Sequence, residues 1–260
     1  MAPARPGTNR TDPSSGPERA GGGVFFVLEG PDGAGKSTQI HRLREALSER
    51  GHDVLLVREP GGTDVGERVR SILLNPGSDD GPAHPAGPAE SRADPPVARA
   101  LTPRTELFLF LASRAQLVSE VIGPALAAGR IVLADRFFAS TAVYQGYASG
   151  ALEAERILEL CLYATSGLTP DMTIVLLVGA DTSQTRVSRD GGLDRIEQRP
   201  TTYFERVTEG YRQYADGAPE PVVPIDGERP EDAVFADVLV AVLGVIEERQ
   251  RPADSRTAAC

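Results

Sequence analysis

Short apolar runs alternate with longer amphipathic segments along most of this chain. Five runs, each rich in β-branched residues and short for a helix, predict buried strands at 24–29, 53–59, 130–135, 172–178 and 221–226. Between them, apolar residues recur at helical spacing and predict helices at 36–50, 64–74, 104–128, 140–147, 153–165, 203–214 and 231–248. We also expect a bend near Gly123-Pro124 and a helix capped by Asp181. This alternation predicts an α/β fold, a five-stranded parallel sheet with helices on both faces.

The pattern breaks in segments that carry no apolar period. Of the 21 prolines, four lie in residues 1–22 and seven in residues 76–103. These segments have too few apolar side chains to offset the entropy lost on ordering. We therefore expect a disordered tail at 1–22, a Pro/Gly-rich insertion at 75–103, a disordered tail at 249–260, and a single domain over 23–248.

Composition excludes several classes of protein. The net charge of −10 argues against a general nucleic-acid binder, although local arginines can still build an anion-binding cleft. No run reaches the roughly 18 apolar residues of a membrane span, and the polar N-terminus lacks a signal-peptide core. Cys161 lies in an apolar run and Cys260 is the last residue, so neither a disulfide framework nor a zinc site is indicated. We expect a cytoplasmic protein with neither nucleic acid nor membrane as partner.

The stretch GPDGAGKS at 30–37 fits the phosphate-binding pattern G-x-x-x-x-G-K-[ST] without mismatch. It follows a predicted strand and opens a predicted helix, which is the structural context that this motif requires. Glycines let backbone N–H groups surround phosphate oxygens, the lysine reaches the β- and γ-phosphates, and the serine holds Mg²⁺. The predicted ATP-binding residues are Gly30, Pro31, Asp32, Gly33, Ala34, Gly35, Lys36, Ser37 and Thr38.

The nucleotide is expected to serve small-molecule phosphoryl transfer. A GTPase usually reads guanine with an Asn-Lys-x-Asp element, and the two asparagines of this chain, Asn9 and Asn75, do not belong to one. A protein kinase needs a different glycine loop and a His-Arg-Asp loop, and neither is present.

Three predicted strand ends carry candidate chemistry. Ligands of such sheets bind outside the carboxyl ends of the strands, which gathers segments 30–37, 58–63 and 135–136 on one rim. Arg58 and Arg136 can hold a phosphate there with two hydrogen bonds each. Asp135 ends a strand as the metal-binding aspartate of P-loop enzymes does, so it can join Ser37 at Mg²⁺.

Four further segments, taken with this loop, resemble the thymidylate kinase family. They are VREPGGTDVGERVRSILL at 57–74, ELFLFLASRAQLV at 106–118, ADRFFASTAVYQGY at 134–147 and RVSRDGGLDRIEQ at 186–198. The resemblance implies a P-loop, nucleoside monophosphate kinase-like fold. It also implies the reaction ATP + dTMP → ADP + dTDP with Mg²⁺, in dTTP biosynthesis, and a homodimer with the 104–128 helix as a candidate interface.

The resemblance also implies where the monophosphate of dTMP lies. It assigns Arg58, Arg70 and Arg136 to this phosphate and places Asp32 near the sugar 3′-hydroxyl and the metal. Lys36 and Arg136 would then stabilise the transferring phosphoryl group.

The base and sugar are implied to contact two helices. Phe110 and Arg114 are four residues apart and share a helical face. In the family the phenylalanine stacks on thymine and the arginine contacts its edge. Thr141 and Tyr144 are three apart, and the resemblance places them near the base and the 2′ position of the sugar.

A catalytic arginine is expected outside the glycine loop, because none of residues 31–34 is an arginine. Arg186, Arg189 and Arg195 surround Gly191-Gly192, a pattern typical of a mobile lid over 186–198. Asp190 stands where related sequences carry a basic residue, which leaves the choice between Arg186 and Arg189 open.

Two alternatives remain at this point. One is a nucleoside monophosphate or deoxynucleoside kinase with another base preference, which the positions of Phe110, Arg114 and Thr141 would decide. The other is an ATP-binding regulatory module without transfer activity, against which the intact Lys36 and Ser37 argue.

Overall fold

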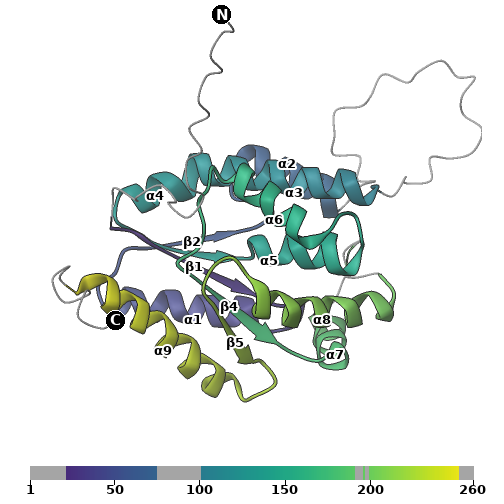
Figure 1. The fold of residues 1–260 in the computed structure, drawn as a ribbon. Coiled ribbons are helices and arrows are strands. Elements are labelled where there is room, and N and C mark those ends of the chain that lie inside the picture. Colours follow the sequence, from purple (N-terminus) through teal and green to yellow (C-terminus); the bar gives the residue numbers. More distant parts are fainter. Residues whose placement is uncertain (1–21, 75–100, 191–195, 197–198, 252–260) are drawn as a thin grey trace, which may run out of the picture.

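The computed structural model describes residues 22–74, 101–190, 196 and 199–251 of the chain (Figure 1), and of residues 189 and 190 it describes the backbone. The expected tails and most of the 75–103 insertion lie outside these residues. The five predicted strands form one parallel sheet with the order β2-β3-β1-β4-β5. Their bounds are Val24–Glu29 (β1), Val54–Arg58 (β2), Ile131–Asp135 (β3), Met172–Leu177 (β4) and Val222–Asp226 (β5).

Helices cover both faces of the sheet, so the predicted α/β fold is confirmed. One face carries α1 (Lys36–Glu49) and α9 (Glu231–Gln250), and the other carries α2 (Asp64–Leu74), α3 (Pro103–Leu117), α6 (Ala154–Ala164) and α8 (Thr201–Gly217) (Figure 1). Strand β1 alternates between the two cores: Phe25 and Val27 pack under α3 and α8, whereas Phe26 and Leu28 pack under α1 and α9. Both faces of the central strand are therefore apolar.

The helix predicted over 104–128 consists of three segments. Helix α3 continues into a π-helical segment, η2 (Val118–Ile122), and then into α4 (Gly123–Ala127). Pro124 has no N–H to donate to the preceding turn, which accounts for irregular backbone at the predicted place. The stretch Pro103–Ala127 is long and apolar enough to cross a membrane by length and composition alone. Its buried charged residues, Glu106 and Arg114, make polar contacts inside the domain, as expected of a core helix.

Two other helices differ from expectation. The helix predicted at 140–147 begins earlier, as α5 (Phe138–Thr141), and continues as a π-helical segment, η3 (Ala142–Ala148). Helix α7 spans Ala180–Asp190, so the expectation that Asp181 caps it is wrong. Asp181 lies inside the first turn, where its negative charge still favours the helix N-terminus.

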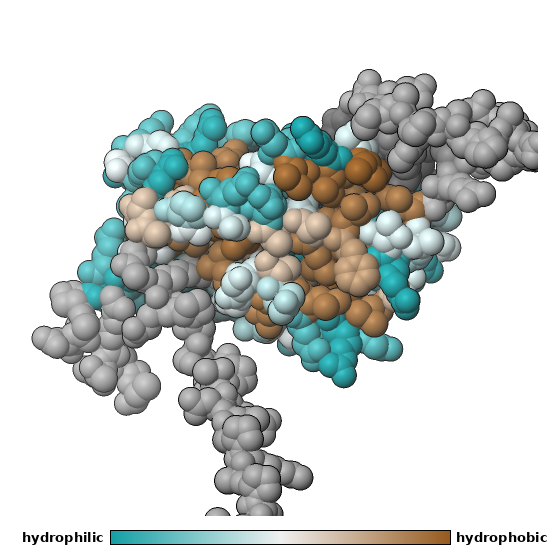
Figure 2. Space-filling view, turned by 90° about the horizontal axis from the view of Figure 1, so that it is seen from above, coloured by the Kyte–Doolittle hydropathy of each residue, from teal (hydrophilic) through white to brown (hydrophobic). Residues whose placement is uncertain are grey.

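Strand register brings the expected functional segments together. Asp135 at the end of β3 pairs with Leu28 of β1 on one side and with Arg58 of β2 on the other. The loops after these three strands therefore begin side by side on one edge of the sheet. Exposed hydrophobic residues gather over the face formed by α2, α3 and α6 (Figure 2).

Candidate active site

The glycine loop turns from β1 into α1 with a backbone that requires glycine. Gly33 and Gly35 have φ angles of 72° and 92°, in the left-handed region that glycine adopts without steric cost. A Cβ on Gly33 would lie 2.7 Å from the carbonyl oxygen of Ser183. Helix α1 begins at Lys36, and its N-cap residue, Gly35, has no side chain to bond to the first N–H groups, which are therefore available to phosphate oxygens. All the predicted ATP-binding residues, 30 to 38, lie in this loop and the first turn of α1.

Lys36 is buried beneath this loop. Its Nζ donates to the carbonyl oxygens of Gly30 and Pro31 at 2.9 and 2.8 Å. Burial, and next the positive charge of Arg136, lowers the pKa of Lys36 to about 8. The ammonium group is thus held in place before a phosphate arrives, at a free-energy cost that an anionic ligand would offset.

Ser37 and Asp135 form a site that fits a divalent cation. Ser37 Oγ lies 3.4 Å from Asp135 Oδ2. The other carboxylate oxygen of Asp135 is buried and has no hydrogen-bond partner among the described residues. A cation would satisfy this oxygen, whose burial without a partner is otherwise unfavourable. A hydroxyl and a carboxylate suit Mg²⁺, which proteins usually hold through few protein oxygens together with phosphates and water.

Arg136 connects the glycine loop to helix α5. It is mostly buried, and its φ of 76° lies in the left-handed region. Nη1 donates to the carbonyl oxygen of Gly30 at 3.2 Å, and Nη2 pairs with the carboxylate of Asp32. The hydroxyl of Tyr144 also donates to Asp32, at 2.9 Å, and the Arg136 guanidinium lies over its ring. Burial alone would raise the pKa of Asp32, but Arg136, Lys36 and these hydrogen bonds outweigh it and lower that pKa, so Asp32 stays ionised.

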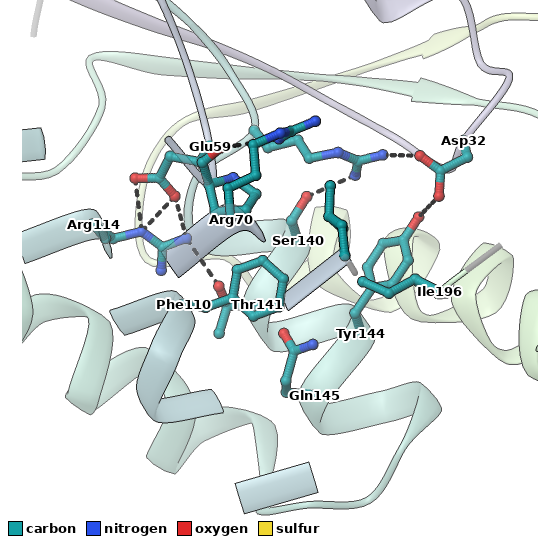
Figure 3. Close-up of a pocket in the computed structure, with 13 residues that line it drawn as sticks. Asp32, Glu59, Arg70, Phe110, Arg114, Ser140, Thr141, Tyr144, Gln145 and Ile196 are labelled. Carbon is teal, nitrogen blue, oxygen red and sulfur yellow. Dashed lines mark hydrogen bonds and ion pairs between the residues drawn. The ribbon is translucent and has the colours of Figure 1, made fainter. Parts of the chain in front are cut away.

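A cavity of about 200 Å³ opens beside this cluster (Figure 3). Asp32 and Tyr144 lie at one end, the buried pair of Glu59 and Arg114 lies at the other, and Phe110 projects between them. The cavity collects residues from five separate segments of the chain. Seven predicted site residues line it: Asp32, Arg70, Phe110, Arg114, Arg136, Thr141 and Tyr144.

Arg114 is fixed by an extensive set of buried contacts. Its Nε donates to both carboxylate oxygens of Glu59, at 3.1 and 2.8 Å, and Nη2 donates to Thr141 Oγ1 at 2.9 Å. Nη1 lies 3.0 Å from the sulfur of Cys161. Burial alone would lower the pKa of Arg114, but the charge of Glu59 holds it above its usual value. The cation therefore persists inside the protein and orients the hydroxyl of Thr141 at the cavity wall.

Arg58 and Arg70 occupy different positions. Arg70 Nη1 donates to the carbonyl oxygen of Pro60 at 3.0 Å, and its side chain lines the cavity. Arg58 is 57% exposed, pairs with Glu67 at 3.3 Å, and lines an adjoining groove with Ser37 and Asp135. Arg58 is therefore separate from the first cavity in this structure, although the groove shares Arg70 and Arg136 with it.

Of the three expected lid arginines, the structure describes one side chain. Arg186 on α7 donates to the carbonyl oxygens of Gly33 and Gly227, both at 3.2 Å. It therefore lies on the outer side of the glycine loop. Arg195 and the side chain of Arg189 lie outside the described residues, so the choice between Arg186 and Arg189 stays open.

Several residues of the site were not singled out from the sequence. Glu59, Ser140, Gln145 and Ile196 line the cavity. Gln145 Nε2 donates to the buried Glu106 at 2.7 Å, and Glu106 also pairs with Arg199 at 2.8 Å. The segments REPGGT, ADRFFASTAVYQGY and LDRIE contain all four lining residues, so attention to every polar position in them would have found Glu59, Ser140 and Gln145.

Comparisons with known proteins agree with this geometry. The family model described as "Thymidylate kinase" matches residues 28–82 and 97–238. Thymidylate kinases of Pseudomonas putida (strain F1) and Exiguobacterium sp. (strain AT1b) are 42% and 39% identical to this chain. The alignments cover 86% and 84% of the chain and 97% and 92% of the relatives. The crystal structure of thymidylate kinase from Ehrlichia chaffeensis matches with a TM-score of 0.61 and 29% identity, over 85% of this chain and 99% of that one.

Proposed function

The chain belongs to the thymidylate kinase family, and we propose from this that it transfers the terminal phosphoryl group of ATP to dTMP. The products are ADP and dTDP, and Mg²⁺ accompanies ATP. The reaction belongs to nucleotide biosynthesis and feeds the supply of dTTP. A cytoplasmic location, without nucleic acid or membrane as partner, suits such an activity.

The observation that carries this proposal is that the glycine loop and the cavity adjoin each other and share residues. Asp32 is part of the glycine loop and also lines the cavity, and Arg136 contacts the Gly30 carbonyl while lining the same cavity. A phosphate donor in the loop and an acceptor in the cavity would therefore meet at Arg136. Such proximity of donor and acceptor is the main requirement for phosphoryl transfer.

The charged residues at this junction suit the developing negative charge. Lys36, held by two carbonyl oxygens, would turn its ammonium group to the terminal phosphates of ATP. Arg136 would exchange its partner Asp32 for the acceptor phosphate, and Arg70 would hold the same phosphate from α2. Bound Mg²⁺, held through Ser37 and Asp135, would neutralise charge on the phosphate oxygens.

The other end of the cavity suits a pyrimidine base. The half-buried Phe110 would stack on the ring. Arg114 keeps its charge and fixes Thr141, so polar groups would face the edge of the base. Tyr144 stays protonated, because burial and the nearby Asp32 raise its pKa well above the usual value. Its ring lies beside Asp32, where it would contact the sugar and crowd a 2′-hydroxyl.

A panel of acceptors tests this proposal. ADP formation should be followed with dTMP, dUMP, dCMP, dAMP, dGMP, UMP and thymidine at equal concentrations, with ATP and Mg²⁺ in excess. We expect the highest kcat/KM with dTMP. A higher value with another monophosphate, or with thymidine, would replace dTMP by that acceptor and leave the kinase mechanism in place.

We also propose that the protein is a homodimer through α2 and α3. Val65 and Ile72 on α2 are each 47% exposed, and Phe108 on α3 is 57% exposed. These side chains belong to the helices over which Figure 2 shows hydrophobic residues gathered. An exposed apolar face of this kind is typical of a protein–protein interface. It extends the interface expected for the 104–128 helix to include α2.

A further inference from the structure

Glu29 is a fully buried carboxylate with no assigned role. It is the last residue of β1, directly before the glycine loop, and it is 0% exposed. Its Oε1 accepts hydrogen bonds from the backbone N–H groups of Phe137 and Ser140 at 2.6 and 3.0 Å. Its Oε2 accepts from the hydroxyls of Ser140 and Tyr211 at 2.6 and 3.2 Å. Four donors thus converge on one carboxylate, and no salt bridge joins it to a cation within the part of the chain that the structure describes.

These four donors surround Arg136. Phe137, whose N–H binds Glu29, follows Arg136 directly, so Glu29 stabilises the turn in which Arg136 adopts its left-handed φ. The two hydroxyls that bind Glu29 also contact the Arg136 side chain. Nη1 lies 2.9 Å from Ser140 Oγ and 3.2 Å from the Tyr211 hydroxyl oxygen. Glu29 therefore acts on both the backbone and the guanidinium of the same arginine.

The direction of these hydrogen bonds follows from the groups at each end. A carboxylate can only accept and a guanidinium can only donate. The proton of Ser140 therefore points to Glu29, and that of Tyr211 points to Glu29 or to Ser140 Oγ, which lies 3.0 Å from it. In either arrangement the lone pairs of both hydroxyls remain available to Arg136 Nη1. The two terminal nitrogens of the guanidinium therefore have different partners: Nη1 donates to fixed acceptors, while Nη2 pairs with Asp32 at the cavity.

We propose that Glu29 is a positioning residue that, through Ser140 and Tyr211, aims Nη2 of Arg136 at the acceptor phosphate. This inference rests on the proposed role of Arg136 in holding that phosphate. Nη1 remains anchored during the exchange of Asp32 for phosphate, so the guanidinium changes partner at one nitrogen without losing its orientation. Such anchoring reduces the conformational freedom that binding would otherwise have to restrict.

The mildest test is Tyr211→Phe, which removes one acceptor of Nη1 and keeps the ring in the core. We expect kcat/KM for dTMP to fall about 3- to 10-fold, the effect of one hydrogen bond, with the KM for ATP unchanged. The matched control is Tyr214→Phe on the same helix. The Tyr214 hydroxyl is equally buried, but it donates to Glu220 at 2.6 Å and makes no contact with Arg136. Both variants should have lower thermal stability, and only Tyr211→Phe should have a lower kcat/KM for dTMP.

Glu29→Gln tests the direction of the bonds. An amide NH₂ would face either the two backbone N–H groups or the two hydroxyls, and in the second case the hydroxyl protons would turn toward Arg136. We expect a larger loss of kcat/KM for dTMP than in Tyr211→Phe, again without change in the KM for ATP. If this variant does not fold, Tyr211→Phe alone decides.

A coupling measurement separates positioning from general stability. Calorimetric affinity for dTMP should fall on Tyr211→Phe in the natural chain and should not fall further in an Arg136→Ala background. An equal loss in both backgrounds, or kinetics of Tyr211→Phe that match Tyr214→Phe, would overturn the proposal. If the natural chain fails to phosphorylate dTMP, the proposed function is contradicted instead. The activity of the natural chain is therefore measured before any variant is compared with it.

Discussion

Among single residues, Lys36 has a pKa that is shifted into the range of ordinary enzyme assays. Burial of its ammonium group, and next the positive charge of Arg136, lowers its pKa to about 8, while two backbone carbonyl oxygens hold the group in place. The ligand-free protein therefore begins to lose this charge near pH 8, and a bound phosphate would raise the pKa again.

The pH dependence of ATP use should report this lysine. Only the protonated form attracts phosphate, so kcat/KM for ATP should fall as pH rises above about 8, while kcat at saturating ATP should fall only at higher pH because bound phosphate raises the pKa. Initial rates between about pH 6.5 and about pH 9.5 provide both profiles. A kcat/KM that stays constant over this range would contradict the assignment. Lys36→Ala should remove turnover and leave the circular dichroism spectrum unchanged.

Phe110 offers a test at the base-binding end of the cavity. Phe110→Ala should raise the KM for dTMP roughly 10-fold or more through loss of stacking, with a much smaller change in the KM for ATP. Tyr163→Ala is the control, because Tyr163 is an aromatic residue that is 87% exposed on α6, and it lines neither the cavity nor the proposed interface. Equal changes in both KM values would make Phe110 a packing residue of the core.

Residues that belong to recognisable motifs could be predicted from the sequence, whereas the buried residues that form hydrogen bonds with them could not. The glycine loop and the acceptor residues Arg70, Phe110 and Thr141 could be named because they belong to local motifs. Glu29 and Tyr211 could not, since their partners Phe137 and Arg136 are 108 and 75 residues away. Only the fold brings such pairs into contact.

At the scale of elements, one phosphate site is formed by the loops that follow β1, β2 and β3, together with the first turns of α7. Helix α7 contacts the glycine loop twice: Ser183 Oγ donates to the Asp32 carbonyl oxygen at 2.6 Å, and Arg186 donates to that of Gly33. The helix therefore supports the conformation of the loop from outside.

Arg186→Ala should consequently weaken ATP binding more than dTMP binding, because Arg186 contacts the glycine loop and does not line the acceptor cavity. We expect the KM for ATP to rise about 3- to 10-fold, as for the loss of one or two hydrogen bonds. Ser188→Ala on the same helix is the control, since its hydroxyl bonds only to the Gln184 carbonyl within the described residues. A selective rise in the KM for dTMP would place Arg186 at the acceptor instead.

Element positions followed from hydrophobic periodicity, and their internal irregularities did not. All five strands begin and end within one residue of expectation. The π-helical segments Val118–Ile122 and Ala142–Ala148 were missed, because residue periodicity hardly distinguishes them from α-helix. The early start of α5 at Phe138 was missed as well. The carboxylate that accepts from the N–H groups at this helix start is Glu29, which lies on β1, far from α5 in the sequence.

At the scale of the whole molecule, the sheet separates two hydrophobic cores with different tasks. The core around α1 and α9 packs against one face of the sheet. The core around α3, α6 and α8 extends to the acceptor cavity and contains Tyr144 and Tyr211. Packing changes on this second side should therefore affect catalysis as well as stability.

The proposed dimer gives a prediction at this scale. Ile72→Glu on α2 should shift the protein to a monomer, because it places a charge in an apolar interface. Analytical ultracentrifugation at several concentrations measures the shift. Val240→Glu is the control, since Val240 is 72% exposed on α9, on the opposite face of the sheet. An unchanged dimer in Ile72→Glu, or a natural chain that is a monomer, would contradict an interface at α2 and α3.

The most direct test of the central claim is product analysis with the full chain, ATP, Mg²⁺ and dTMP. Chromatographic separation of the nucleotides should show ADP and dTDP formed in equal amounts, and neither with Lys36→Ala. ADP formed with free phosphate and without dTDP would show that the acceptor cavity does not receive the phosphoryl group, and would contradict the account.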